Sequence, residues 1–190
     1  MNYPNAIKKK KTALTREPSF SNRGMLLENE LNISNEYYRS IDKAYIYKKP
    51  TPIKITNVDY PSRNKAVITK AYFTVPSTTD YNGIYKGKYI DFEAKETKST
   101  TSFALENIHE HQIEHLKNIY RHQGISFIIV RFSTLNKTYL LMTKDLIEFI
   151  STEKRKSIPL SYFEEKAYLI KDGYTPRLDY LKIIDQIGGI

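Results

Sequence analysis

The sequence predicts an α/β protein in which helices pack against a mixed central sheet. Stretches of helical periodicity alternate along the chain with stretches of strand-like periodicity. The segment 125–132 is almost continuously apolar, which is typical of a strand buried on both faces. The chain has 190 residues, 40% of them hydrophobic, which is enough for one domain with a core but hardly for two. We therefore expect a basic arm over residues 1–20 and a single domain over residues 21–190.

The composition favours a polyanionic partner. Lys and Arg number 30 against 21 Asp and Glu, which gives a formal net charge of +9 and a pI near 9.4, and nucleic acid attracts such a chain. The absence of cysteine excludes disulfides, thiolate metal sites and cysteine nucleophiles, and it fits a reducing cytoplasm. No apolar run approaches the roughly 18 to 20 residues of a membrane span, and the amino terminus lacks the apolar core of a signal peptide. We expect a soluble cytoplasmic protein with no membrane partner.

The arm over residues 1–20 is expected to be flexible. Residues 8–11 are all lysine, large apolar residues are few, and no periodicity is present. Such a composition buries too little apolar surface to order itself. A DNA-binding arm and a solubilising tail are equally compatible with it.

The first helix is predicted near residues 24–40. One face of this helix carries the stripe Leu27, Leu31, Ser34, Tyr38 and Ile41. Glu28 lies beside the stripe and is a candidate metal contact, although a solvated helix charge is its default interpretation. Arg23, just before the helix, is a candidate phosphate contact with the same default.

The segment from about residue 50 to 76 is predicted to leave the core. It carries short β-like runs that are interrupted by prolines and accompanied by lysines, Arg63 and aromatic residues that include Phe73. Basic and aromatic residues together suit contact with nucleic acid. A solvated hairpin explains the same pattern without any partner.

The rest of the chain completes the α/β order. Residues 80–95 form two alternating runs around a glycine-containing turn and predict a β-hairpin. Residues 105–123 are the strongest predicted helix, with Gly124 as its C-terminal stop. The remaining predicted elements are strands over 125–132 and 138–142, a helix over 144–150, and a short helix that opens at a capping box of Ser161 and Glu164.

Asp80, Glu93 and Lys95 of the hairpin are the candidate catalytic residues. Side chains alternate along a strand, so Glu93 and Lys95 share one face, and Asp80 belongs to the neighbouring run. Mg²⁺ is held by one or two carboxylates and keeps several waters, and with a lysine it can stabilise the charge of phosphodiester hydrolysis. Charged residues on one strand face are also typical of a solvated surface. The apolar opposite face and the basic chain favour a nuclease.

Polar residues interrupt the helix predicted over 105–123. Gln112 lies within the apolar stripe, either as a satisfied core amide or as a ligand that faces the site. His111 and His115 have the i, i+4 spacing of metal ligands. Structural or phosphate-contacting roles are favoured over zinc, because the chain has no cysteine and offers further histidines only near the same helix.

Several long motifs spread over nearly the whole chain form a specific combination. They are FSNRGM at 20–25 with Glu28, KKPTP at 48–52, PSTTDYNG at 76–83, YIDFEAKET at 89–97, HQI at 111–113 and RLDYL at 177–181. In this combination the chain resembles the RecU-type Holliday junction resolvases of bacteria. The resemblance implies a restriction-endonuclease-like fold with a protruding stalk, and a homodimer. It also implies Mg²⁺-dependent symmetric nicking of four-way DNA junctions during homologous recombination, DNA repair and chromosome segregation.

The resemblance also implies roles for single residues. The metal ligands correspond to Thr78, Asp80, Glu93 and Gln112, and the lysine that stabilises the transition state corresponds to Lys95. Mn²⁺ is a candidate substitute for Mg²⁺. The stalk corresponds to the excursion at about 50–76, where Arg63 and Phe73 are expected to contact junction DNA, as is Arg23 outside it. Recombinase and branch-migration proteins are candidate protein partners.

Two alternatives stay open at this point. The first is a nuclease of the same fold that acts on linear duplex DNA. The second is a non-catalytic module that binds junctions or modulates a recombinase, in which the acidic residues are only structural.

Overall fold

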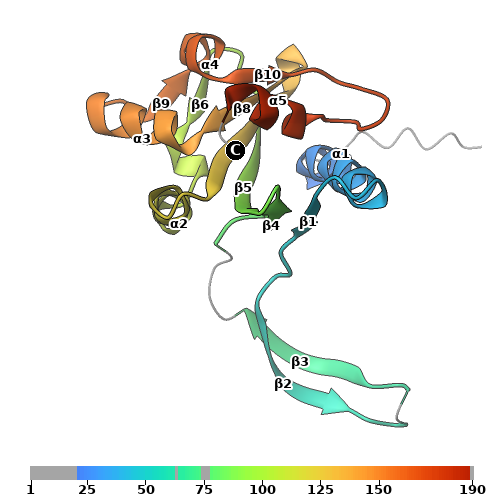
Figure 1. Cartoon of the computed structure of the whole chain (residues 1–190). Coiled ribbons are helices and arrows are strands. Elements are labelled where there is room, and N and C mark those ends of the chain that lie inside the picture. Colours follow the sequence, from blue (N-terminus) through green and yellow to red (C-terminus); the bar gives the residue numbers. More distant parts are fainter. Residues whose placement is uncertain (1–20, 63, 74–77, 189–190) are drawn as a thin grey trace, which may run out of the picture.

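The structure is a computed structural model that describes residues 21–62, 64–73 and 78–188, with side chains from residue 26 onward (Figure 1). Its centre is a six-stranded sheet in the order β1-β4-β5-β7-β8-β10. The strands are β1 (Tyr45–Lys48), β4 (Tyr81–Tyr85), β5 (Lys88–Thr97), β7 (Ile125–Phe132), β8 (Lys137–Met142) and β10 (Tyr168–Ile170). β5 and β7 are parallel, and every other neighbouring pair is antiparallel. The predicted mixed sheet is confirmed.

Helices cover both faces of the sheet and enclose two cores. One core lies under α1 (Ser21–Ser40) and α5 (Tyr180–Ile187). The other lies under α2 (Glu110–Arg121), α3 (Thr143–Thr152) and α4 (Leu160–Lys166), beside a small sheet of β6 (Ser102–Ala104) and β9 (Ser157–Pro159). All eight residues of β7 are buried, and its apolar side chains are divided between the two cores, Ile125, Phe127 and Ile129 in one and Ile128, Val130 and Phe132 in the other. The prediction of a strand buried on both faces is therefore correct.

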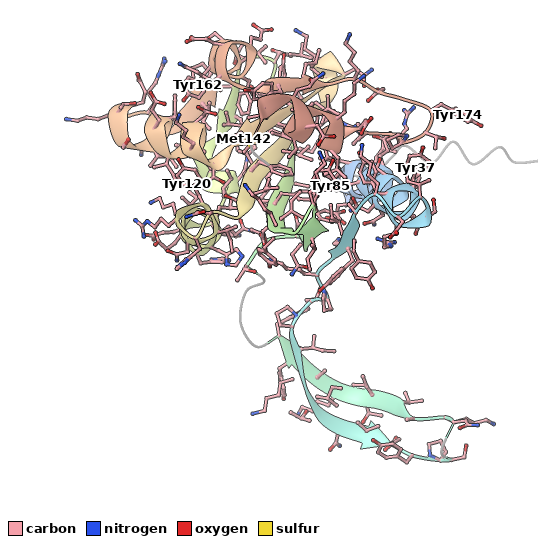
Figure 2. All side chains as sticks on the ribbon, viewed as in Figure 1. Tyr37, Tyr85, Tyr120, Met142, Tyr162 and Tyr174 are labelled. Carbon is pink, nitrogen blue, oxygen red and sulfur yellow. The ribbon has the colours of Figure 1, made fainter. Side chains whose placement is uncertain are left out.

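The excursion forms the predicted stalk. Strands β2 (Ile53–Asp59) and β3 (Val67–Phe73) pair with each other in a separate two-stranded sheet, and Figure 1 shows this hairpin projecting away from the body. Every residue of β3 is exposed, and in β2 only Val58 is partly covered. Figure 2 shows the stalk side chains pointing into solvent rather than into a core. Backbone pairing is the main link between the two strands, because the hairpin has no apolar interior, and the Thr56 hydroxyl adds a bond to the Lys70 carbonyl at 3.1 Å.

Three local predictions require correction. Ile41 is exposed and not part of the α1 stripe, because the helix ends at Ser40 and Asp42 adopts a left-handed backbone with φ 55°. The helix predicted over 105–123 is divided into a short 3₁₀ turn, η1 (Leu105–Asn107), and α2. The capping box at Ser161 is wrong, because α4 begins at Leu160 and Ser161 lies inside the helix.

No helix in the described part of the chain is both long enough and apolar enough to span a membrane.

Candidate active site

A tight turn sets the register of the hairpin that carries the site. Lys86 and Gly87 connect β4 and β5, and both have positive φ angles, 47° and 77°. Two such residues in succession fit a type I′ turn, whose twist matches that of paired strands. The register pairs Tyr81 with Phe92. Asp80, directly before β4, is thereby brought beside Glu93 on β5.

Asp80 and Glu93 are linked through their backbone and side chains. The backbone N–H of Asp80 donates to Glu93 Oε2 at 3.0 Å. The backbone N–H of Ala94 donates to Asp80 Oδ2 at 3.1 Å. The two carboxylates therefore lie next to each other at the end of the hairpin, as the candidate site requires.

Glu93 is almost fully buried, with 1% of its surface exposed. Its Oε1 accepts from Lys95 Nζ at 2.7 Å and from Gln112 Nε2 at 2.8 Å. Burial is the main cause that raises the pKa of Glu93 to about 7, and the neighbouring charge of Asp80 adds to it. The Lys95 ammonium acts in the opposite direction. A further cation beside Glu93 would stabilise the ionised form of its carboxylate.

Lys95 and Gln112 approach Glu93 from different elements. Lys95 follows on the same face of β5, and 23% of its side chain remains exposed. Gln112 belongs to the first turn of α2, and its Oε1 accepts the backbone N–H of His109 at 3.0 Å. Gln112 is therefore a satisfied buried amide, as one of the two interpretations expected, and it contacts the carboxylate of Glu93. Its role as a metal ligand stays a prediction.

A second buried carboxylate, Asp91, lies on the same face of β5 and was missed as a candidate. It is fully buried and accepts from Lys49 Nζ at 2.7 Å, from the Tyr89 hydroxyl at 2.9 Å and from the Thr79 hydroxyl. His115 Nε2 lies 3.2 Å from it. The strand alternation that places Glu93 on this face also includes Asp91, so that signal was present in the sequence. His115 thus contributes a contact to the buried Asp91 carboxylate.

Thr78 belongs to this second network. It is exposed, directly precedes Thr79 and Asp80, and its hydroxyl accepts from Lys49 Nζ at 3.0 Å. Its position thus agrees with the predicted metal site, while its role as a ligand stays a prediction.

The donor atoms fit a hard divalent cation. Asp80 and Glu93 supply carboxylate oxygens, and Thr78 offers a hydroxyl at the same end of the hairpin. Oxygen ligands suit Mg²⁺ and Mn²⁺ rather than softer metals. Within the described ranges, no group of three or more His, Cys, Asp and Glu side chains is assembled to hold a metal. A cation at a pair of carboxylates would keep water ligands, as Mg²⁺ usually does.

The remaining predicted residues either lie outside the described side chains or, within the described part of the chain, form no hydrogen bond or ion pair with Asp80 or Glu93. Arg63 and the side chain of Arg23 are among those not described. Phe73 is 81% exposed at the end of β3. Glu28 pairs with Lys48 in an ion pair, which gives its carboxylate a partner other than a metal.

Comparison with known proteins assigns the family. The family model of Recombination protein U, RecU, matches residues 22–186. The chain belongs to the RecU family. It is 54% identical over 174 residues to Holliday junction resolvase RecU of a Geobacillus species. That alignment covers 90% of this chain and 87% of the Geobacillus protein. The chain is 51% identical over 188 residues to Holliday junction resolvase RecU of Bacillus cytotoxicus, with 97% and 94% covered.

One solved structure adds a distant likeness. Archaeoglobus fulgidus Hjc, described as a Holliday junction resolvase from an archaeal hyperthermophile, aligns with a TM-score of 0.44 and 11% identity. The alignment covers 77% of this chain and 91% of that chain. The match to the RecU family model includes the hairpin, the stalk and α2.

Proposed function

We propose that this chain is a Holliday junction resolvase, an Mg²⁺-dependent endonuclease that makes symmetric nicks in four-way DNA junctions. Its place would be in homologous recombination, DNA repair and chromosome segregation, in the cytoplasm. The cluster of Asp80, Glu93, Lys95 and Gln112 carries the proposal, because it combines neighbouring carboxylates with an ammonium at one end of a rigid hairpin. Membership of the RecU family and relatives of about half identity that bear this name support it.

The proposed reaction is hydrolysis of a phosphodiester by in-line attack of water. Asp80 and Glu93, with Thr78 and Gln112 beside them, would hold Mg²⁺ or Mn²⁺, which supplies Lewis acidity at the phosphate. The water oxygen forms a bond to phosphorus and the bond to the 3′ oxygen breaks. The attacking water gives up a proton and the leaving 3′ oxygen takes one up, so the products are a 5′-phosphate and a 3′-hydroxyl, ends that ligase can rejoin.

Lys95 has a role of its own in this reaction. Its ammonium lies 2.7 Å from Glu93 and is partly exposed, so it can donate to a phosphate oxygen while the carboxylate holds it in place. Negative charge accumulates on that oxygen as the bond to water forms. A donor that is already oriented stabilises this charge without reorganisation.

Glu93 would bind the cation in its ionised form. The raised pKa of about 7 arises from burial and from Asp80, and a divalent cation would offset both. The carboxylate is therefore expected to lose its proton when the metal binds.

The proposed active form is a homodimer on four-way junction DNA. Resolution needs two symmetric cuts, and a two-fold dimer presents two identical sites to a substrate of the same symmetry. The stalk is proposed to contact the open centre of the junction, because its side chains point outward and include the exposed Phe73. Recombinase and branch-migration proteins are further candidate partners of the basic arm over residues 1–20.

The decisive experiment compares a mobile four-way junction with linear duplex of the same sequence, in Mg²⁺ and in EDTA. We expect paired nicks in the junction, little cutting of the duplex, and no cutting in EDTA. Equal rates on the two substrates would support a duplex nuclease instead.

The variants Asp80→Asn and Glu93→Gln decide between an enzyme and a binding module. We expect both to bind the junction and neither to cut it. Survival of cutting in both variants would remove this active site, and a wild-type chain that binds junctions without cutting them would favour a non-catalytic module.

A further inference from the structure

The two chain segments at the root of the stalk are joined by one side chain. Lys49 follows the end of β1 and precedes β2, while Thr78 and Thr79 lie after β3, where the chain has returned to the body. Lys49 Nζ donates to Thr78 Oγ1 at 3.0 Å and to Thr79 Oγ1 at 2.6 Å. The backbone N–H of Lys49 also donates to the carbonyl of Asp80 at 2.7 Å. The segment that leaves the body is therefore hydrogen-bonded to the segment that returns to it. The bonds reach Thr78 and Asp80, which are both predicted metal ligands.

Asp91 connects Lys49 to the central sheet. Its Oδ2 lies 2.7 Å from Lys49 Nζ, and the carboxylate is fully buried in the middle of β5. The hydroxyl of Thr79 donates to its other oxygen. Tyr89 and His115 contact it from β5 and from α2. Several elements thus fix the position of Asp91, and Asp91 fixes the ammonium of Lys49.

The surroundings of Lys49 argue against a contact with DNA. Only 14% of its side chain is exposed, compared with 40% for the adjacent Lys48. A lysine ammonium has three N–H donors, and Thr78, Thr79 and Asp91 accept all three. Lys49 has no donor left for a phosphate unless it breaks one of these bonds.

We propose that Lys49 and Asp91 are a pair of positioning residues that hold Thr78 and Asp80 in the geometry required for hydrolysis at the root of the stalk. This inference rests on the proposed function and adds two residues to its site. Neither residue touches the reacting phosphate in this proposal. Groups that orient metal ligands in this way typically change metal affinity by about 10-fold to 100-fold when they are removed.

The test uses the double variant Lys49→Met with Asp91→Asn in the full chain. Removing both charges together avoids an unpaired buried ion, which is the main threat to folding. The control is Lys137→Met, which removes a 3.0 Å ion pair with Glu164 at the surface. The unfolding midpoint of each protein is measured first by urea denaturation.

Three measurements then separate positioning from other roles. Single-turnover nicking of a four-way junction is expected to fall about 100-fold in the double variant, as for a small misplacement of reacting groups. Mn²⁺ binding without DNA, measured by calorimetry, is expected to weaken about 10-fold or more. Junction affinity in Ca²⁺, and its dependence on salt, should stay unchanged. Lys137→Met should match the wild type in all three.

Two results would overturn the inference. One is a double variant that nicks junctions and binds Mn²⁺ like the wild type. The other is a loss of junction affinity with a shallower salt dependence, which is the behaviour of a lysine that contacts phosphate.

A second variant covers the case in which the double variant does not fold. Asp91→Asn alone keeps the shape of the side chain and an oxygen acceptor, while it weakens the hold on Lys49. It must then lower nicking and Mn²⁺ affinity in the same direction, and wild-type values would refute the proposal. Failure of the proposed function has a different signature, because wild-type protein itself would then leave junctions uncut.

Discussion

Replacement of Glu93 by glutamine is expected to abolish cutting and to stabilise the metal-free protein above neutral pH. The pKa of Glu93 is raised from its ordinary value of 4.5 to about 7, mainly by burial. The folded chain therefore binds this proton more tightly than the unfolded chain does. The stability from the bound proton is fully present below pH 4.5 and is lost as the pH rises through 7. Glutamine carries no charge at any pH and escapes this loss.

The size of the effect follows from the shift in pKa. The rise from 4.5 to about 7 spans 7 − 4.5 = 2.5 pH units, and each unit corresponds to about 1.36 kcal/mol. The ionised carboxylate thus costs the folded state about 3 kcal/mol at pH 8. At pH 5 most of this cost is absent, because the folded chain still holds the proton. The stability difference between variant and wild type should therefore change by about 2 kcal/mol between these two pH values, in favour of the variant.

Urea denaturation in EDTA at pH 5, 6, 7 and 8 measures this difference. Glu164→Gln is the matched control, because Glu164 pairs with Lys137 at the surface, where both side chains are more than 40% exposed. A difference in the free energy of unfolding that does not vary with pH would refute the reasoning. Addition of Mn²⁺ should stabilise the wild type and leave Glu93→Gln nearly unchanged, and its effect on the wild type should fade below pH 7 as protons compete for the carboxylate.

Other predictions concern the rest of the molecule. Glu30→Gln should lower the free energy of unfolding by about 3 kcal/mol, because it leaves the buried Arg131 without its carboxylate; an unchanged urea midpoint would contradict this. Gly83→Ala should detach β1, since a Cβ there would lie 2.1 Å from the carbonyl oxygen of Tyr45; hydrogen exchange of the β1 amides should then accelerate, and unaltered protection would argue against it. Phe73→Ala should weaken junction binding without altering the unfolding midpoint, because this side chain is 81% exposed; unchanged affinity would remove the stalk contact.

The sequence was sufficient to predict the hairpin that carries the candidate site because its signals are local. Two residues with positive φ close the turn, and the apolar alternation of Ile90 and Phe92 decides which face of β5 meets the core under α1. Glu93 must then lie on the opposite face. The helical stripe alone left Gln112 open between a core amide and a site-facing residue, and only the resemblance to RecU-type resolvases placed it beside Glu93, which it contacts.

Other parts were missed because their signals are short or distant in sequence. Strands β6 and β9 have three residues each and pair across more than 50 positions, so neither shows a period. Helix α5 has eight residues, and its buried face became recognisable only against α1 and the sheet. The partner of Lys49 is 42 positions away, and a single lysine among many gives no local sign of burial.

The stalk has a consequence for how this protein can change. Within the described residues, neither β2 nor β3 contributes a side chain to either apolar core. Substitutions along the hairpin thus carry almost no penalty for the stability of the body, and under the proposed function selection on them would act through DNA recognition. The hairpin can therefore be exchanged without repacking the cores of the body. Chimeras that receive a hairpin of different length or charge at the same two roots should keep their nuclease body and acquire a new preference among branched DNAs.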